Sequence, residues 1–238
     1  MSKPQLALNN LLLQVLSNEQ LPDFFLHLEL VAMPLGKVLH EPGSAIGFVY
    51  FPSDCIVSLL SVMRDGFSGE IAVVGKEGVV GVAAFMGGES AQSRAVVQSA
   101  GYAYRIAASY VTETFNQSDR FRSVLLRYTQ ALISQISQTA GCNRHHSIDQ
   151  QLCRLLLLSL DRLPSNQIIM TQELIANMLG VRREGVTEAA GKLQRQGIIE
   201  YKRGHITVLR REALERLSCE CYFVVKKEFD RLLPCKTS

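Results

Sequence analysis

The 238-residue sequence predicts an α+β protein with a β-rich front half, a long central helix and a mainly helical C-terminal part. Three observations support this fold class. Short apolar segments alternate with turn residues up to about residue 107, a helical repeat of apolar positions follows residue 111, and two short helices precede a hairpin near the end. We therefore divide the chain into residues 1–110, 111–142 and 143–238.

The composition is that of a globular protein, with 47% apolar and 20% charged residues. This balance excludes a mostly disordered or collagenous chain. No run of 18 consecutive apolar residues occurs, and the start of the chain does not resemble a secretory signal. We therefore expect a cytoplasmic protein with no membrane partner.

The front half begins with a short leucine-rich helix around Leu11 to Leu16, which ends before Pro22. Short segments rich in Val, Ile, Phe and Tyr then follow, with turn residues between them. Such spacing is typical of an antiparallel sandwich or barrel. The predicted strands are Lys37–His40, Phe48–Phe51, Ile56–Met63, Glu70–Val74, Ala95–Gln98 and Tyr102–Ile106.

A heptad-like seam marks the central helix, because six positions advance by alternating steps of four and three residues. We assign this seam to a dimer interface, with an ordinary buried helix in a monomer as the alternative. A second apolar stripe, formed by Leu126, Ile133 and Ile136, lies beside it, so one stripe could pack on the front domain while the other meets a partner helix. The seam residues are Phe121, Leu125, Tyr128, Leu132, Gln135 and Thr139.

Residues 169–199 predict two short helices joined by a tight turn. Thr171 is a good N-cap for the first helix, and Gly180 suits the left-handed position that ends it. The second helix begins near Arg182 and ends near Gln196. This pattern is typical of a helix-turn-helix, whose second helix places its N-terminal residues against base edges in the major groove of DNA.

A small hairpin follows, with strands at 198–201 and 206–209 and a basic turn between them, as in the wing of a winged helix. Lysine and arginine at such a tip suit contacts with the phosphate backbone. A generic three-helix module with a solvated basic face is the alternative. The candidate DNA-binding residues are Thr171, Gln172, Arg182, Arg183, Glu184, Thr187, Glu188, Lys202 and Arg203.

The charge distribution agrees with this assignment. Residues 1–110 carry 6 basic and 9 acidic side chains, whereas residues 143–238 carry 16 basic and 11 acidic ones. A basic C-terminal part behind an acidic front part suggests a polyanionic partner for the C-terminal part.

Taken together, these features resemble the Crp/Fnr family of bacterial transcription regulators. The sharpest match is the stretch from Gly180 to Val186, in which Arg183 and Glu184 correspond to the Arg-Glu pair that opens the family's recognition helix. The resemblance implies a cupin-like β-roll of the cyclic-nucleotide-binding type as sensor domain, a dimerisation helix and a winged helix-turn-helix domain. It also implies three partners, namely double-stranded DNA, a second copy of the chain and RNA polymerase. Where the archetype has a second arginine, this sequence has Glu188, so the half-site is expected to differ.

The effector pocket fits the family less completely. Gly81 and the pair Arg94-Ala95 resemble the frame that holds a cyclic nucleotide, in which arginine meets the phosphate and a glutamate meets the ribose. The glutamate position is Val82 here. Because a buried ribose hydroxyl would lose its partner, at a cost of about 1–3 kcal/mol, we disfavour a cyclic nucleotide as effector and keep it as an alternative to a degenerate pocket or an unknown ligand.

No metal or cofactor is expected from the sequence. Residues 1–54 contain no cysteine, which argues against the N-terminal iron–sulfur cluster of oxygen-sensing members. Among the cysteines only Cys219 and Cys221 are close in sequence, and no second close pair completes a four-thiolate zinc site. We therefore interpret the cysteines mainly as structural thiols, with a metal or redox role as the lesser alternative. His27, His40 and Cys55 are scattered, so a haem site is not expected either.

An enzyme is also not expected. A metal-dependent cupin needs clustered histidine and carboxylate ligands, and His27 and His40 are too sparse to provide them. A third hypothesis, an effector-binding module without specific DNA binding, conflicts with the intact pair Arg182-Arg183. The sequence therefore favours a dimeric DNA-binding transcription regulator that responds to an unidentified signal at the β-roll.

Overall fold

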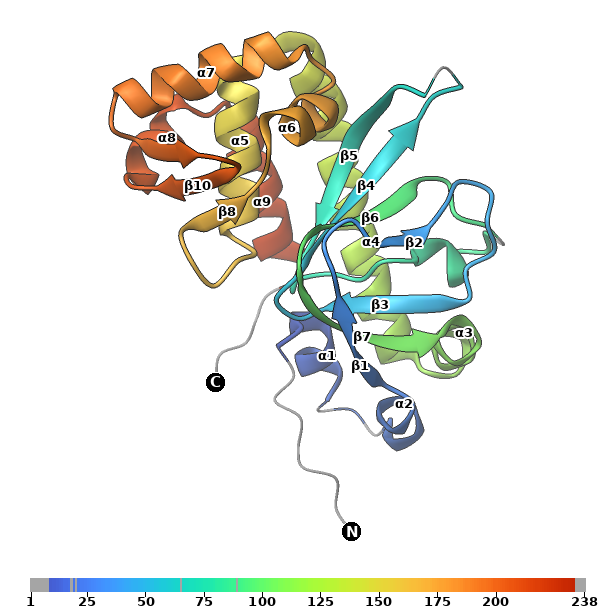
Figure 1. The fold of residues 1–238 in the computed structure, drawn as a ribbon. Helices are drawn as coiled ribbons and strands as arrows, with labels where there is room; N and C mark the ends of the chain where they lie inside the picture. Colours follow the sequence, from blue (N-terminus) through green and yellow to red (C-terminus); the bar gives the residue numbers. More distant parts are fainter. Residues whose placement is uncertain (1–8, 18, 20, 65, 89, 234–238) are drawn as a thin grey trace.

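The computed structural model describes residues 9–17, 19, 21–64, 66–88 and 90–233. The chain forms two parts, a β-roll and a mainly helical C-terminal domain, which are joined by one long helix (Figure 1). This arrangement confirms the predicted α+β fold class.

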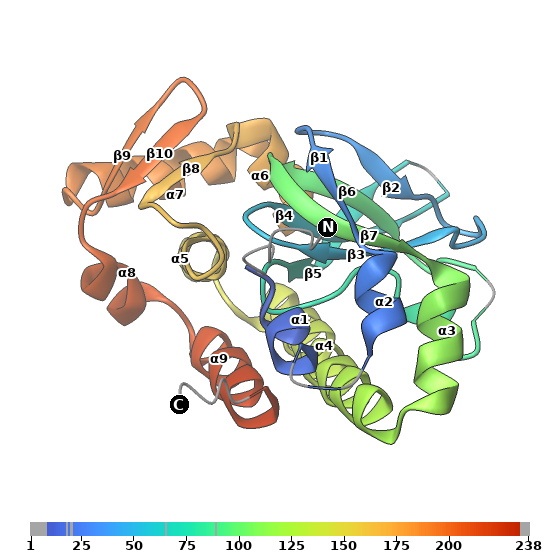
Figure 2. The ribbon, with the colours of Figure 1, turned by 90° about the horizontal axis from the view of Figure 1, so that it is seen from below.

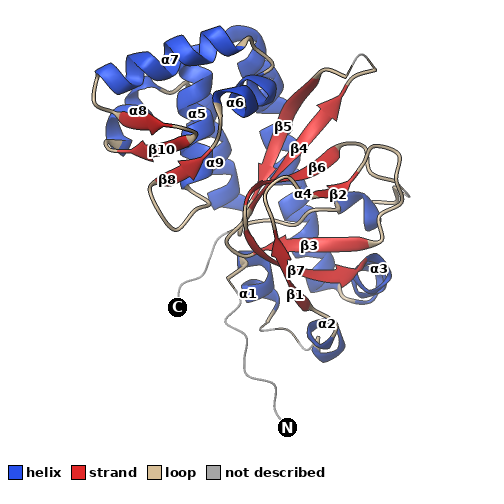
Figure 3. Cartoon of the chain, in the orientation of Figure 1, coloured by secondary structure: helices blue, strands red, loops and turns tan. Residues whose placement is uncertain are grey.

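Among its described residues the β-roll contains seven strands in two antiparallel sheets, one with the order β1-β7-β3 and one with the order β2-β6-β4-β5. The consecutive strands β6 and β7 belong to different sheets, so the chain crosses from one sheet to the other between them (Figure 3). The strands are β1 (Glu29–Met33), β2 (Val38–His40), β3 (Phe48–Pro52), β4 (Ile56–Val62), β5 (Ser68–Val74), β6 (Arg94–Ser99) and β7 (Gly101–Ala107).

All six strands predicted in this region are present, whereas β1 was not predicted as a separate strand. β1 carries only one buried residue, Met33, because it pairs on one side alone, with β7. Its sequence therefore lacks the strong apolar alternation that marks a half-buried strand.

The apolar faces of the strands form one core with the N-terminal helices and the central helix. Three short helices accompany the sheets, α1 (Leu11–Leu16), α2 (Pro22–Leu26) and the 3-10 helix η1 (Val82–Ala84). Figure 2 shows α1 beside the central helix and α2 near the helix α3 (Ala108–Gln117). Phe24 of α2 connects these layers through edge contacts with Phe51 and Phe121.

The predicted helix at 111–142 consists of two helices, α3 (Ala108–Gln117) and α4 (Asp119–His145). Ser118 separates them because its backbone is extended, and its hydroxyl accepts a hydrogen bond from the Phe121 amide at 3.2 Å, as an N-cap does. The central helix thus extends three residues beyond the predicted end at residue 142.

The six seam residues of α4 pack inside the chain, which corrects their assignment to a dimer interface. Phe121, Leu125, Tyr128 and Leu132 belong to the core of the β-roll, and Gln135 donates a hydrogen bond to the Val73 carbonyl on β5. A regular heptad pattern only shows that one face of a helix is covered, and here the chain's own sheet and last helix cover it. Thr139, the sixth residue, is also buried.

The C-terminal domain contains five helices and a small sheet with the order β8-β10-β9 among its described residues. The leucine-rich helix α5 is buried along almost its whole length and forms the centre of this domain. The elements are α5 (Ile148–Leu160), β8 (Gln167–Ile169), α6 (Gln172–Leu179), α7 (Arg183–Arg195), β9 (Ile199–Lys202), β10 (His205–Val208), α8 (Arg211–Leu217) and α9 (Glu220–Leu232). No helix in the described part of the chain is long and apolar enough to span a membrane.

Candidate nucleic-acid interface

The predicted helix-turn-helix is formed by α6 and α7. The Thr171 hydroxyl accepts a hydrogen bond from the Leu174 amide at 3.1 Å and caps α6. Gly180 ends this helix with φ of +67°, a conformation that favours glycine because it has no Cβ. The chain then turns into α7, whose buried face packs on α5 and α6.

The outer face of α7 is polar, and its N-terminal end has no side-chain cap. Arg182 occupies the N-cap position but its side chain accepts no hydrogen bond, so the first backbone N–H groups of α7 lack a capping side chain. Arg183, Glu184 and Thr187 are exposed on the first turns. The start of α7 therefore combines basic side chains with backbone N–H groups that no side chain caps, as expected for a helix that approaches DNA.

The predicted wing is the β9–β10 hairpin, and Lys202 pairs with His205 across its two-residue turn. Arg203 and Gly204, with φ of +51° and +83°, form this turn. Positive φ at both turn residues matches the type I′ turn that suits a two-residue hairpin. Asn or Gly is usual at such positions, so an arginine at the first one is conformationally costly and must be explained by its side chain.

A groove of about 580 Å³ lies between α7 and the wing. It is lined by three arginines, one at each end of α7 and one at the tip of the wing, namely Arg183, Arg195 and Arg203. The Tyr201 hydroxyl donates a hydrogen bond to the Met170 carbonyl at 2.8 Å and connects the wing to the start of α6. Burial raises the pKa of Tyr201 to about 12, against the opposing effect of the Arg183 charge.

The basic side chains of this surface have no acidic partners. Among the described residues, no carboxylate oxygen lies within 4.0 Å of the side-chain nitrogens of these cations, whereas many other arginines of the chain form ion pairs. An unpaired exposed cation keeps its full electrostatic attraction for an anion. The unpaired cations are Arg182, Arg183, Arg195, Lys202 and Arg203.

Three of the predicted contact residues, Gln172, Thr187 and Glu188, have structural partners instead. Glu188 forms an ion pair with Lys192 at 3.1 Å, and Lys192 also reaches Asp149 on α5 at the same distance. The Thr187 hydroxyl donates to Gln172 Oε1 at 2.8 Å and thereby connects α7 to the first turn of α6. These contacts orient the recognition helix, and they make Glu188 less available to a base than Glu184.

The four residues predicted for the effector pocket lie in one region of the β-roll. Gly81, with φ of +102°, precedes Val82 at the start of η1, and Ala95 is buried on β6. Arg94 lines a cavity of about 410 Å³ between the four-stranded sheet and α6, and the other three residues are not part of the lining of that cavity. Its Nε atom lies 3.2 Å from Glu41 Oε1, although the geometry does not form a hydrogen bond.

His40 is a residue near this region that the sequence did not single out as part of a pocket. It is the backbone partner of Ala95, and a Cβ on Gly81 would lie 3.5 Å from its Nε2 atom. His40 is buried, which lowers its pKa, and its Nε2 has no hydrogen-bond partner within the described part of the chain. No sequence motif marks His40, and only its position in the folded chain identifies it.

Comparisons with known proteins agree with this architecture. Residues 150–217 match the family model described as Crp-like helix-turn-helix domain. No curated protein matches the chain. The chain therefore combines a β-roll with a DNA-binding domain of the Crp-like helix-turn-helix class.

Solved structures similar to the chain share its fold over most of its length. One, a protein from Eubacterium rectale described as a regulator of the Crp/Fnr family, has a TM-score of 0.68 and 16% identity, with 85% of this chain and 96% of that chain covered. FixK2 from Bradyrhizobium japonicum has a TM-score of 0.67 and 17% identity, with 81% and 98% covered. The c-di-GMP-responsive global regulator CLP of Xanthomonas campestris has a TM-score of 0.62 and 16% identity, with 79% and 97% covered.

The domain match and the shared fold confirm the resemblance inferred from the sequence. Residues 150–217 thus form a Crp-like helix-turn-helix domain, and the chain has the fold of the solved Crp/Fnr regulators.

Proposed function

We propose that two copies of the chain bind a pseudo-palindromic site in double-stranded DNA and thereby control transcription. The observation that supports this most directly is the group of five unpaired cations on α7 and the wing. In this arrangement α7 enters the major groove and the wing lies along the phosphate backbone. Release of the counterions held by those phosphates then provides much of the affinity.

Base reading is assigned to the first turn of α7. Arg183 can donate two hydrogen bonds to guanine O6 and N7, and Glu184 can accept one from cytosine N4. Both side chains are exposed. Arg182, Lys202 and Arg203 supply phosphate contacts, which position the protein without selecting a sequence.

The dimer is assigned to the face of α4 that remains uncovered. Leu126 and Ile133 are 42% and 50% exposed, and they are separated by one heptad. The exposed positions Gln130, Ser137 and Ala140 continue the same spacing of four and three residues. The row of exposed positions from Leu126 to Ala140 can form the narrow seam of a coiled coil with the same row of a second copy. This pairing places the two α7 helices symmetrically.

Measuring the molar mass in solution tests this interface. We expect a dimer for the wild type and a monomer for the double variant Leu126→Glu/Ile133→Glu. Leu26→Glu introduces the same charge at another exposed leucine and should remain dimeric. A double variant that stays dimeric would contradict the assignment of the interface to this stripe.

The effector is proposed to act at the β-roll, which contacts the DNA-binding domain directly. The Gln98 side chain donates a hydrogen bond to Met170 Sδ at 3.5 Å, and a Cβ on Gly180 would lie 3.4 Å from the Phe67 ring. A ligand that prefers one placement of these contacts changes the population of DNA-competent dimers. RNA polymerase is proposed as the partner through which bound dimers act.

A cyclic nucleotide remains the disfavoured alternative for this effector. Val82 provides no carboxylate for a ribose hydroxyl, and Glu41 already lies beside Arg94 and offsets its charge. Calorimetric titration of the full chain with cyclic AMP and cyclic GMP should detect no binding at micromolar concentrations. Binding that disappears in Arg94→Ala would restore the cyclic nucleotide as effector.

The proposed function is tested by selection of randomised duplex DNA with the purified, ligand-free protein. An enriched two-fold motif with half-sites one helical turn apart is the expected result. Arg183→Ala should relax the preference at one base position of each half-site, whereas Lys227→Ala should retain the whole motif, because Lys227 is an exposed cation on α9. Binding that neither prefers a sequence nor weakens with salt would contradict the proposal.

A further inference from the structure

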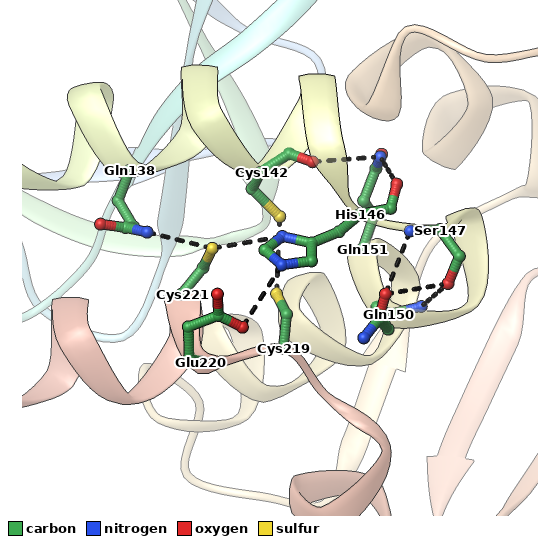
Figure 4. A network of polar contacts seen from close by, with 9 residues as sticks. All are labelled: Gln138, Cys142, His146, Ser147, Gln150, Gln151, Cys219, Glu220 and Cys221. Atoms are coloured by element: carbon green, nitrogen blue, oxygen red, sulfur yellow. Dashed lines mark hydrogen bonds and ion pairs between the residues drawn. The ribbon is translucent and has the colours of Figure 1, made fainter.

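Four potential metal ligands meet where the end of α4 approaches the start of α9 (Figure 4). Cys142 and His146 are one helical turn apart at the end of α4, and Cys219 and Cys221 are at the start of α9. Their ligand atoms all lie within 4.8 Å of one another. The sequence predicts no metal site, because no second close pair of cysteines accompanies Cys219 and Cys221, and Cys142 and His146 are more than seventy residues away from them.

Two of the distances between these ligand atoms are close to the edges of a tetrahedron around one zinc ion. Cys142 Sγ lies 3.6 Å from Cys219 Sγ, and Cys221 Sγ lies 3.4 Å from His146 Nδ1. Zinc bonds of about 2.3 Å to sulfur and 2.0–2.1 Å to nitrogen give tetrahedral edges of about 3.8 Å and 3.6 Å. A four-iron cluster needs thiolates that are farther apart, because its irons and sulfides lie between them.

The surrounding side chains support His146 and Cys221 as ligands. Glu220 Oε2 lies 3.3 Å from His146 Nε2 and can accept a hydrogen bond from Nε2–H, which leaves the lone pair of Nδ1 directed at the sulfurs. Such a carboxylate–histidine pair is the usual outer contact of a metal-bound imidazole. The Gln138 side-chain amide donates to Cys221 Sγ at 3.1 Å, a contact that suits a thiolate acceptor.

The three thiols are closed to solvent, and His146 is half-buried. Cys142, Cys219 and Cys221 are at most 2% exposed, and they form a small buried cluster separate from the two main cores. One Zn²⁺ with three thiolates and a neutral imidazole has a net charge of −1. The buried Arg154, whose guanidinium bonds to the Thr139 hydroxyl one turn before Cys142, provides a compensating charge, and its Nε atom has no partner in the described structure.

We propose that Cys142, His146, Cys219 and Cys221 bind one Zn²⁺ ion as a closed structural site. The spacing Cys-x3-His is within the usual range for zinc ligands, whereas Cys-x-Cys is shorter than the usual Cys-x2–4-Cys. The short spacing is possible because Cys219 is the N-cap of α9 and has an extended backbone, which leaves its sulfur on the same side as that of Cys221.

This ion would cross-link α4 to the last helix of the DNA-binding domain. α9 runs along α4, and Phe229 of α9 contacts the Tyr128 ring of α4 farther along the same pair of helices. The metal would therefore hold the DNA-binding domain in place relative to the helix assigned to the dimer. This inference does not depend on which DNA sequence the protein binds.

The first measurement is the metal content of the full chain. The protein is purified under reducing conditions, stripped with a chelator and reloaded with Zn²⁺, and its metal is measured after purification and again after reloading. We expect about one zinc per chain and a rise of several degrees in the unfolding temperature on reloading, because a ligand that binds only the folded state stabilises it. Loading with Co²⁺ instead should give the thiolate charge-transfer and visible bands of a tetrahedral cobalt site.

Two variants identify the ligands, and one serves as a control. Cys219→Ala and His146→Gln should each lower the zinc content at least about tenfold after gel filtration and remove the temperature rise. Cys55→Ala should retain both, because Cys55 is an equally buried free cysteine in the β-roll. His146→Gln leaves the sulfur cluster unchanged, so it tests the site even where Cys219→Ala fails to fold.

Several outcomes would overturn the proposal. One is less than about a tenth of a zinc per chain after reloading of the reduced protein. Others are the absorption of an iron–sulfur cluster in the purified protein, or unchanged zinc in folded His146→Gln. A disulfide between Cys142 and Cys219 that persists under reducing conditions would also exclude the metal site and assign the two sulfurs to a covalent link.

Discussion

The charges at the junction between the two domains differ from those on the DNA-facing surface. At the junction Arg162 and Glu70 are buried and held by specific partners. On α7 and the wing, Arg183, Lys202 and Arg203 are exposed and have no acidic partner among the described residues. Ionisable groups buried at the junction are held by partners within the fold, whereas the cations available to a polyanion are left unpaired at the surface.

The largest effect is expected at the junction. Arg162 Nε donates to Glu77 Oε1 at 2.8 Å, and Arg162 Nη1 donates to the Leu158 carbonyl at 2.7 Å. Arg162→Ala leaves Glu77 without its partner in a mostly buried site, and we expect a loss of about 3–5 kcal/mol in the free energy of unfolding, measured by urea titration.

Arg120→Ala is the matched control, because Arg120 pairs with Glu19 at the surface, where such a pair contributes at most about 1 kcal/mol. Equal losses in the two variants would show that the junction does not differ from the surface.

The second effect depends on pH and concerns Glu70. Burial raises its pKa to about 7, although the Ser58 hydrogen bond and the charges of Arg154 and Arg162 oppose this shift. The folded protein thus binds this proton more tightly than the unfolded chain, so stability falls as pH rises from about 4.5 to about 7, and the full loss remains above pH 7.

Glu70→Gln removes that loss, so its stability relative to wild type should rise by about 2–3 kcal/mol between pH 5 and pH 8. Urea titrations at the two pH values measure this difference. The exposed Glu29→Gln serves as control and should show little change with pH. A difference for Glu70→Gln that is independent of pH would exclude a protonated Glu70 in the folded protein.

The third effect is on DNA binding. Arg183→Ala should weaken binding to the selected site by about 1–3 kcal/mol and relax the preference at one base position, with little change in stability. Fluorescence anisotropy on the selected duplex and on its single-base variants provides the measurement. A loss of equal size on every sequence would instead place Arg183 on a phosphate.

The smallest effect is expected at the wing. Lys202→Ala should weaken binding to all duplexes to a similar extent and reduce the slope of log affinity against log salt concentration by about one. Salt titrations on specific and random duplexes measure that slope. A loss confined to one base pair would overturn the assignment of Lys202 to the phosphate backbone.

Local sequence patterns predicted the elements that depend on local chemistry. The helix-turn-helix was predictable because Thr171 and Gly180 mark the two ends of α6. The wing was predictable because the turn residues Arg203 and Gly204 separate two short β segments. Strand β8 was not predicted, because its three residues form a strand only through pairing with β10.

The role of the α4 seam could not be determined from its period alone. The spacing of Phe121 and the residues that follow it predicts a covered face, but the same spacing suits a partner chain or the chain's own sheet. The structure shows the second alternative, and it leaves Leu126 and Ile133 as the exposed stripe.

The sequence by itself determined the order of the elements, the helix-turn-helix with its basic face, and the missing carboxylate at Val82. Each of these depends on residues that are neighbours along the chain. The tertiary structure alone decided which side of α4 is covered, that Glu41 lies beside Arg94, and that Cys142 and His146 meet Cys219 and Cys221. Those contacts join residues far apart in sequence, and they form only when packing of the apolar faces brings distant segments together.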